Sequence, residues 1–209
     1  MKNNSTLKWI GSAVLLFLLI LLVIKIRLKL AQDKAIQACE NAFGYMGETQ
    51  QDSIRKIVAA FHRYGDGDQN KLAYILATAK HESNFRPVQE RRAAPNQTEL
   101  YNRQNKYWSS GYFGRGFVQL TWKENYQKMA RVFRVDFVNQ PELALESTYA
   151  ARILVYGMMQ GSFTGLALGD FINEESQDFY KARQVVNRLD RAGLIAEYTK
   201  SVNNYYLMA

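Results

Sequence analysis

A His-Glu-Ser triplet, residues 81–83, closes a segment whose apolar residues recur at helical spacing. We therefore expect a helix over residues 70–83, with Glu82 at its C-terminal end. This is the negative end of the helix dipole, where a carboxylate is electrostatically disfavoured, and such a position suits a general acid. The other interpretation of the triplet is purely structural. The zinc-peptidase pattern His-Glu-x-x-His is excluded, because its second histidine would fall on Phe85.

Two further glutamates, Glu90 and Glu99, follow in the polar and aromatic region 84–113. A loop of this length in a compact domain is usually functional or disordered. A second carboxylate on such a loop is well placed to hold a water across a cleft. In inverting glycosidases the acid and the base lie about 6.5–9.5 Å apart, which leaves room for that water. The alternative is that both glutamates are solvated loop charges, and the sequence leaves open which of them is the base.

The next candidate feature is a turn in which Gly114 and Gly116 flank an arginine. Glycines allow the backbone to approach a ligand closely. The side chains of Gln119, Thr121 and Asn125 follow, and they could converge on one sugar or one water. Thr121 and the glutamate three residues later also form a capping-box pattern, which predicts a helix from here to about residue 132. By composition alone, the segment is a tight turn before a helix.

The remaining elements are also expected to be helical, so the predicted fold is mainly α. From residue 52 an apolar stripe recurs at three and four residues and ends at the Gly-Asp-Gly-Asp turn 65–68. Asp68 or Asn70 is expected to cap the following helix. No strand alternation is convincing, although a small hairpin fits within residues 84–117. The other expected helices cover residues 141–158, 164–172, 178–188 and 191–207.

The N-terminal region contains an uncharged apolar run of 16 residues, Trp9–Ile24. With its neighbours it gives a segment, residues 7–26, of about the length that a membrane-spanning helix requires. We expect residues 1–30 to be a retained anchor with basic flanks, and residues 31–51 a linker or a short helix. A cleaved signal peptide would need a small-residue site soon after the run, and the sequence instead continues with basic and branched residues. A buried core helix is the third alternative.

The charge distribution excludes some function classes. The net charge of +8 includes five basic residues and no acid in residues 1–30, so the rest of the chain has 22 basic against 19 acidic side chains. A nucleic-acid-binding domain would concentrate basic charge, so we expect no nucleic-acid partner. The single cysteine, Cys39, cannot form an internal disulfide, and with two histidines it cannot build a structural zinc site. We expect no metal and no cofactor.

Two motifs in order resemble the family 19 glycoside hydrolases, which include chitinases and the chitinase-like endolysins of bacteriophages. The first is the triplet 81–83, and the second is Gly-Arg-Gly-x-x-Gln-Leu-Thr-x-x-x-Asn-Tyr at residues 114–126. A later segment, Ala-Arg-x-Val-Val-Asn at residues 182–187, is also similar to the family. The resemblance runs from about residue 52 to 207. It implies a bilobal helical domain of the lysozyme-like superfamily over residues 52–209, preceded by one N-terminal transmembrane helix.

The resemblance also implies roles for individual residues. Glu82 matches the general acid, and Glu90, five residues after Phe85, matches the general base. Further residues are expected to hold the substrate or the attacking water: His81, Arg115, Gln119, Thr121, Asn125, Tyr126 and Asn187. Candidates for sugar stacking are Tyr107, Trp108 and Tyr112, with Tyr101 and Trp122 as further aromatic candidates. The sequence departs from the family where Arg188-Leu189 replaces the usual Gly-Gly and where a later supporting arginine falls near Glu197.

These observations together predict a membrane-anchored hydrolase that cuts the β-1,4 bonds of peptidoglycan glycan strands, an endolysin or muramidase-like enzyme of phage lysis. It would invert the anomeric carbon with two carboxylates, without a cofactor, as a monomer. The expected location is the bacterial inner membrane, single-pass, with the C-terminal domain in the periplasm; a virion membrane is the other option. Alternatives are a chitinase, a non-catalytic membrane-tethered peptidoglycan-binding protein, and a lytic transglycosylase, which would need only one carboxylate.

Overall fold

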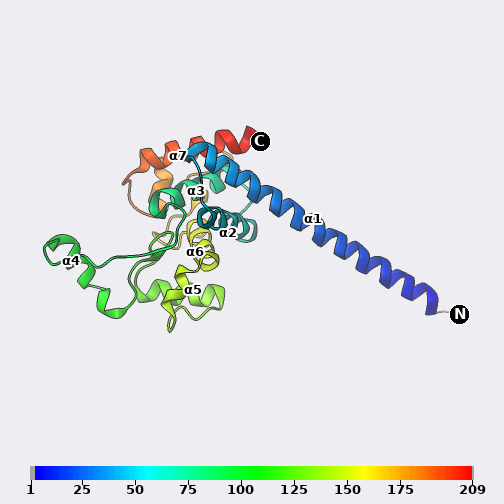
Figure 1. Ribbon diagram of the computed structural model, residues 1–209, viewed down its shortest axis with the longest axis horizontal. Coiled ribbons are helices and arrows are strands. Elements are labelled where there is room, and N and C mark those ends of the chain that lie inside the picture. The colour runs from blue at the N-terminus through cyan, green and yellow to red at the C-terminus, as the bar shows by residue number, and fades with distance from the viewer. Residues whose placement is uncertain (1–2, 209) are drawn as a thin grey trace.

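The computed structural model describes the backbone of residues 3–208 and the side chains of residues 14–206. It is mainly α-helical, as predicted (Figure 1). The described α-helices are α1 (Asn3–Phe43), α2 (Glu48–Tyr64), α3 (Gln69–Ser83), α4 (Thr98–Asn105), α5 (Lys123–Phe133), α6 (Ser147–Met159) and α7 (Ala192–Met208). The short strands β1 (Val88–Gln89) and β2 (Arg115–Gly116) form an antiparallel pair in the region where a small hairpin was expected, but residues 90–114, which include α4, connect them. Four 3-10 turns complete the elements: η1 (Trp108–Ser110), η2 (Pro141–Leu145), η3 (Leu168–Asp170) and η4 (Lys181–Val185).

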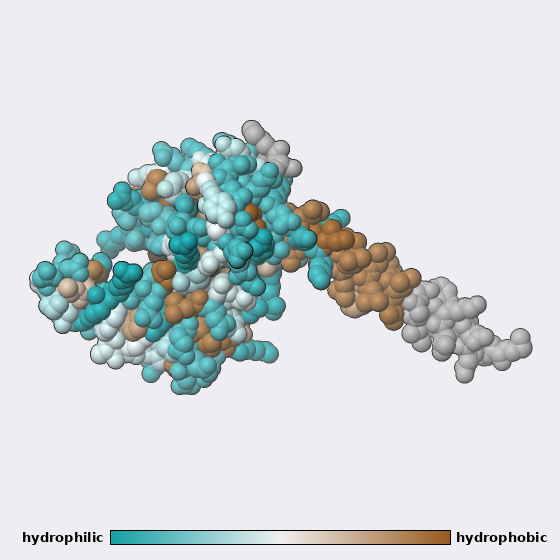
Figure 2. Space-filling model, in the orientation of Figure 1, coloured by the Kyte–Doolittle hydropathy of each residue, from teal (hydrophilic) through white to brown (hydrophobic). Residues whose placement is uncertain are grey.

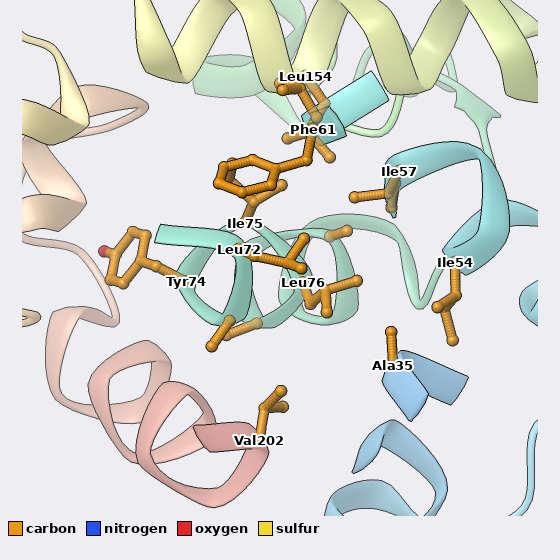
Figure 3. Packing of buried hydrophobic residues seen from close by; sticks show 14 of the residues in the cluster. Ala35, Ile54, Ile57, Phe61, Leu72, Tyr74, Ile75, Leu76, Leu154 and Val202 are labelled. Atoms are coloured by element: carbon orange, nitrogen blue, oxygen red, sulfur yellow. The ribbon is translucent and has the colours of Figure 1, made fainter. Parts of the chain in front are cut away.

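Helix α3 lies at the centre of the larger of two hydrophobic clusters (Figure 3). Its residues 71–79 are all buried, which explains why its apolar residues are not confined to one face. Around it pack Ile57 and Phe61 from α2, Leu154 from α6 and Val202 from α7. The backbone N–H groups in the first turn of a buried helix need hydrogen-bond acceptors. The Asp68 carboxylate accepts a hydrogen bond from the backbone N–H of Asn70 at 2.8 Å, which confirms the predicted cap.

A second, smaller cluster surrounds α5 and forms the other part of the domain. It contains Leu120, Tyr126, Met129, Phe137 and Ile153, all with side chains at most 2% exposed. Ile153 belongs to α6, which also contributes to the first cluster through Leu154. Helix α6 therefore joins the two clusters, and the polar loops between them are supported from both sides.

Residues 31–51 were expected to be a linker or a short helix, and helix α1 extends into them. It continues without a break to Phe43, and Ala35, Ala38 and Cys39 are almost fully buried in the first cluster. Residues 31–43 are therefore not a linker, because their small apolar side chains recur at helical spacing and pack against α2 and α7. Only the Gly44–Gly47 segment connects α1 to α2, which agrees with the two glycines acting as breakers.

The first half of α1 projects away from the domain (Figure 1). From Val14 to Ile24 every apolar side chain on it is exposed, and Figure 2 shows them as a continuous apolar band. Among the described residues, no helix combines the length and hydropathy that crossing a membrane requires. Residues 7–13 of the expected anchor lie outside the residues whose side chains are described.

Three predicted helices have different boundaries. The segment 141–158 is split into η2 and α6, because Glu146 between them has an extended backbone. The segments 164–172 and 178–188 contain only the 3-10 turns η3 and η4. The capping box predicted at Thr121 does not form, since its hydroxyl donates to the carbonyl of Gln119 at 2.8 Å and the helix begins at Lys123. At these places the packing of the connecting loops determines the backbone conformation, and the local helix preference of the sequence does not.

Candidate active site

Glu82 lies in the last turn of α3, and the geometry of the helix end determines where it stands. Asn84 and Phe85 both adopt left-handed backbone conformations, with φ of 50° and 58°. The first is a frequent way to end a helix, whereas the second is strained for a bulky residue. Phe85 is completely buried, so core packing stabilises this turn. The chain is thereby redirected into β1, and Glu82 stays at the edge of the core.

The carboxylate of Glu82 is held by Arg183, which comes from η4 about a hundred residues later. The guanidinium donates to Glu82 Oε1 at 2.6 Å, and its Nε donates to the carbonyl of Asp190 at 2.8 Å. The side chain of Arg183 is 2% exposed and that of Glu82 is 21% exposed. One face of the carboxyl group is thus fixed by a buried cation while the other reaches solvent. Arg183 is a positioning residue for Glu82.

This role of Arg183 was not predicted from the sequence, although the residue stands inside the late motif at residues 182–187. The available signal was an arginine among apolar neighbours, Ala182 and Val185, which are both fully buried. A charged side chain in such surroundings is almost always paired. The sequence alone does not identify which of the 19 acidic residues is the partner, because the contact is made entirely in three dimensions.

Glu90 lies directly after β1, and its carboxyl group accepts more hydrogen bonds from the protein than that of Glu82. Its Oε1 accepts hydrogen bonds from Gln104 Nε2 at 2.9 Å and from the Tyr107 hydroxyl at 2.7 Å, and its Oε2 accepts from the backbone N–H of Gly114 at 3.0 Å. Its own backbone N–H donates to the carbonyl of Gly114 at 2.8 Å, which extends the strand pair. Three donors surround this carboxyl group, and an ionised carboxylate acts only as an acceptor. The arrangement suits the role of a base.

Glu99 occupies a different place. It is exposed in the first turn of α4, which extends away from the body of the domain (Figure 1). It lines a separate groove of about 480 Å³ together with its helix neighbours Gln97, Thr98, Leu100 and Arg103. Of the two glutamates that the sequence left open, the structure gives Glu90 the fixed position.

The Gly-rich turn brings three of the predicted side chains together. Gln119 Nε2 donates to the carbonyl of Val88 at 2.9 Å, and Asn125 Nδ2 donates to the carbonyl of Thr121 at 2.8 Å. Gly114 must remain small, because a Cβ there would lie 2.7 Å from Gln119 Oε1. Gln119, Thr121 and Asn125 line a groove of about 130 Å³ with Val118, Leu120, Trp122, Phe163 and Val186. We call this the polar groove.

Segments that contact the two carboxylates also contribute to the polar groove, although neither carboxylate lines it. On one side, Gly114 binds Glu90 and packs against Gln119, which lines the groove. On the other side, Val186 lines the groove directly after η4, the turn that carries Arg183. The two segments that hold the carboxylates therefore also form the walls of the groove. The Thr121 hydroxyl donates its hydrogen bond within the protein, to the carbonyl of Gln119. Its oxygen therefore remains free to accept a hydrogen bond from a water.

Arg115 and Tyr126 are buried, so the expectation that they touch substrate requires correction. Arg115 donates to the carbonyl of Gly111 at 2.9 Å and to the Tyr126 hydroxyl at 3.0 Å. The Tyr126 hydroxyl in turn donates to the carbonyl of Phe113, and burial raises the pKa of this phenol. Both residues fix the shape of the Gly-rich turn from within, because a loop that carries site residues needs its backbone carbonyls satisfied.

The remaining predicted residues have different exposures, and of these only Trp122 lines the polar groove. His81 is half-buried on α3, one residue before Glu82, and Asn187 is exposed one residue after Val186. Among the aromatic candidates, Tyr107 and Tyr112 are hydrogen-bonded within the protein, and Trp108 stacks on Phe113 with ring centroids 4.4 Å apart. Tyr101 lies under the guanidinium of Arg92 on the α4 arm. Trp122 is 43% exposed in the groove wall, which makes it the better platform for a sugar ring.

We expect Tyr107→Phe to lower kcat about tenfold, because it removes one of the three donors that orient Glu90. Burial and the hydrogen bond to Glu90 raise the pKa of Tyr107 to about 12, so the phenol remains a donor throughout the neutral range. Turnover of a glycan substrate and urea unfolding of both chains measure the effect. Tyr112→Phe is the matched control, since its hydroxyl donates at 2.9 Å to the carbonyl of Val138 and not to Glu90. Equal kcat in the two variants would contradict the role of Tyr107.

Among the residues whose side chains are described, no group of three or more histidine, cysteine or acidic side chains is placed to hold a metal ion. The burial of Cys39 strongly raises the pKa of its thiol, which keeps it protonated inside the core.

Comparison with known protein families gives one match. A family model described as chitinase class I of the family 19 glycoside hydrolases covers residues 29–160, and no curated protein matches the chain. The matched region includes both carboxylates and the polar residues 119–125. The matched region begins within α1 rather than at residue 52, which agrees with the burial of Ala35, Ile36, Ala38 and Cys39. It ends before Arg183, the residue that holds Glu82. Because the match covers more than half of the sequence, the chain belongs to the family 19 glycoside hydrolases.

Proposed function

We propose that this glycoside hydrolase cleaves the β-1,4 bonds of peptidoglycan glycan strands and inverts the anomeric carbon. The observation that carries the proposal is the arrangement of the two carboxylates. Each is held by its own segment, Glu82 by Arg183 and Glu90 by Gly114, and the same two segments line the polar groove. In this proposal a glycan crosses the groove and reaches Glu82 beyond one wall and Glu90 beyond the other, since neither carboxyl group lines the groove itself.

The reaction is a single displacement in which protons and bonds balance. Glu82 in its protonated form donates to the glycosidic oxygen while the bond from that oxygen to the anomeric carbon breaks. Glu90 in its ionised form takes a proton from a water, and the water oxygen bonds to the anomeric carbon from the opposite face. The Thr121 oxygen is suited to hold that water. One water is consumed, and both carboxyl groups regain their starting states by exchange with solvent.

The apolar half of α1 supports the assignment to the bacterial envelope. Its exposed side chains between Val14 and Ile24 form a patch far larger than soluble monomers usually present, and basic residues follow it at Lys25 and Arg27. We propose that residues 7–26 hold the enzyme in the host inner membrane with the C-terminal domain in the periplasm, or in a virion membrane. A phage lysis enzyme fits this arrangement. The continuous helix through residue 43 would keep the catalytic domain close to the lipid surface.

Chitin is the second candidate substrate, because the matched family model is described as chitinase. Both polymers consist of β-1,4-linked sugars with N-acetyl groups, and the polar groove is compatible with either. A non-catalytic tether is less well supported, since binding alone does not require two carboxyl groups positioned in this way.

The test is mass spectrometry of the products that the full-length chain releases from purified peptidoglycan and, in parallel, from chitin oligomers. We expect fragments with ordinary reducing ends from peptidoglycan, and NMR of the first products should show the inverted anomer. Cleavage of chitin oligomers alone would replace the substrate assignment. No cleavage of either polymer by the folded protein would favour the tether.

A further inference from the structure

A second groove lies beside the polar groove and has a different character. It has a volume of about 570 Å³ and is lined by Thr164, Leu166, Gln184, Arg188 and Leu189. We call it the Arg188 groove. It differs from the polar groove in having an arginine, Arg188, in its wall.

The two grooves are formed by the same two segments of chain. Phe163 lines the polar groove and Thr164 the Arg188 groove, and on the other segment Val186 lines the first while Gln184 and Arg188 line the second. The segments are joined, since the Thr164 hydroxyl is 2.8 Å from the carbonyl of Gln184 and donates to it. A long glycan that leaves the polar groove along these segments therefore meets the Arg188 groove next.

Arg188 is exposed and unpaired within the described part of the molecule. None of the ion pairs there includes it, and only its backbone N–H is engaged, by Asn187 Oδ1 at 3.0 Å. Asp190 is the nearest acidic residue in sequence, and its side-chain carboxylate is not in any of these ion pairs either. The guanidinium is thus available for a carboxylate, which it can bind with two parallel hydrogen bonds.

We propose that the Arg188 groove binds the acidic substituent of N-acetylmuramic acid, so that Arg188 selects peptidoglycan over chitin. This inference rests on the proposed function and names the feature of the substrate that the site distinguishes. The lactyl group of muramic acid ends in a carboxylate when free and carries an acidic stem peptide when substituted, whereas chitin bears no carboxylate. The apolar side chains of Leu166 and Leu189 suit the methyl group of the lactyl unit.

The test compares Arg188→Gln with Arg191→Gln in the full-length chain. Arg191 is three residues away, equally exposed, and lines neither groove, so its substitution changes the net charge identically. Binding is measured on a Glu82→Gln background, which leaves the ligands intact. The ligands are peptide-stripped peptidoglycan strands with free lactyl carboxylates and the uncharged hexamer of N-acetylglucosamine.

We expect Arg188→Gln to weaken binding of the acidic strands about tenfold, and to leave binding of the hexamer unchanged. Arg191→Gln should alter neither, and Arg188→Lys should restore part of the loss because it retains the charge without the planar fork. High salt should reduce the difference between the two ligands in the parent chain.

Equal weakening on both ligands, equal effects of the two arginine variants, or no measurable binding of the acidic strands would each overturn the proposal. The outcome is separate from that of the proposed function, because binding is read without turnover. A chain that binds the strands through Arg188 but cuts neither polymer would refute the hydrolase assignment alone. An Arg188→Gln chain that binds and cuts peptidoglycan as well as the parent would refute the recognition by Arg188 alone.

Discussion

Glu82→Gln is expected to reduce kcat about 10³-fold, because the amide cannot donate the proton that the leaving oxygen requires. Glutamine has the shape of the carboxyl group, and its Oε1 can still accept the hydrogen bond that Arg183 donates at 2.6 Å. Substrate affinity should therefore change little, and the loss should appear in kcat rather than in KM. Steady-state turnover of peptidoglycan fragments measures both parameters.

The control for this prediction must separate catalysis from folding, because Arg183 is buried with its charge. Glutamine removes the ion pair and keeps the hydrogen bond, so we expect the free energy of unfolding to fall by about 1–3 kcal/mol. Glu99→Gln is the matched variant, since it changes the same residue type on an exposed helix and should alter neither stability nor turnover. Turnover by Glu82→Gln within a few-fold of the parent would remove Glu82 from the role of acid.

The sequence was sufficient to predict those parts of the fold that depend on local periodicity. The stripe of Ile54, Ile57, Val58 and Phe61 gives α2, and all four side chains are buried as their spacing requires. The cap at Asp68 and the end of α3 follow from equally local preferences. Glu82 and the trio of polar groove residues could be chosen because the two motifs that carry them resemble the family; composition alone predicted only a tight turn before a helix for the trio.

The residues that the sequence misassigned depend on contacts between distant segments. Arg115 carries a charge inside a family motif, which suggested substrate binding, and only the packed structure shows its donors directed at loop carbonyls. Residues 31–43 are polar enough that the sequence left open a linker or a short helix, and only the structure shows that one face of them completes the core. The contact from Arg183 to Glu82 spans 101 residues and has no counterpart in local pattern. These features arise from tertiary packing, which overrides local preference.

Glu90→Gln is expected to reduce kcat by about 10²–10⁴-fold if the reaction is a two-carboxylate inversion, since the water then loses its base. The substitution retains an oxygen that can accept from Tyr107 and Gln104, while the new amide group faces the N–H of Gly114, where the carboxylate accepted a hydrogen bond. That conflict should lower the free energy of unfolding by about 1–3 kcal/mol without preventing folding. Urea unfolding and steady-state turnover of the same preparation separate the two effects.

The same variant decides between hydrolysis and transglycosylation, because the two mechanisms need different numbers of carboxyl groups. A lytic transglycosylase uses one carboxyl group and closes the product ring with the sugar's own hydroxyl, so no water has to be activated. In that case Glu90→Gln would remain active and the fragments would end in anhydro sugars. The three donors that fix Glu90 beside the polar groove favour the opposite result, in which activity is lost and the parent's products carry reducing ends. Retained activity together with reducing ends would instead assign the base to another residue, and Glu99→Gln, made for the first prediction, would then be the variant that identifies it.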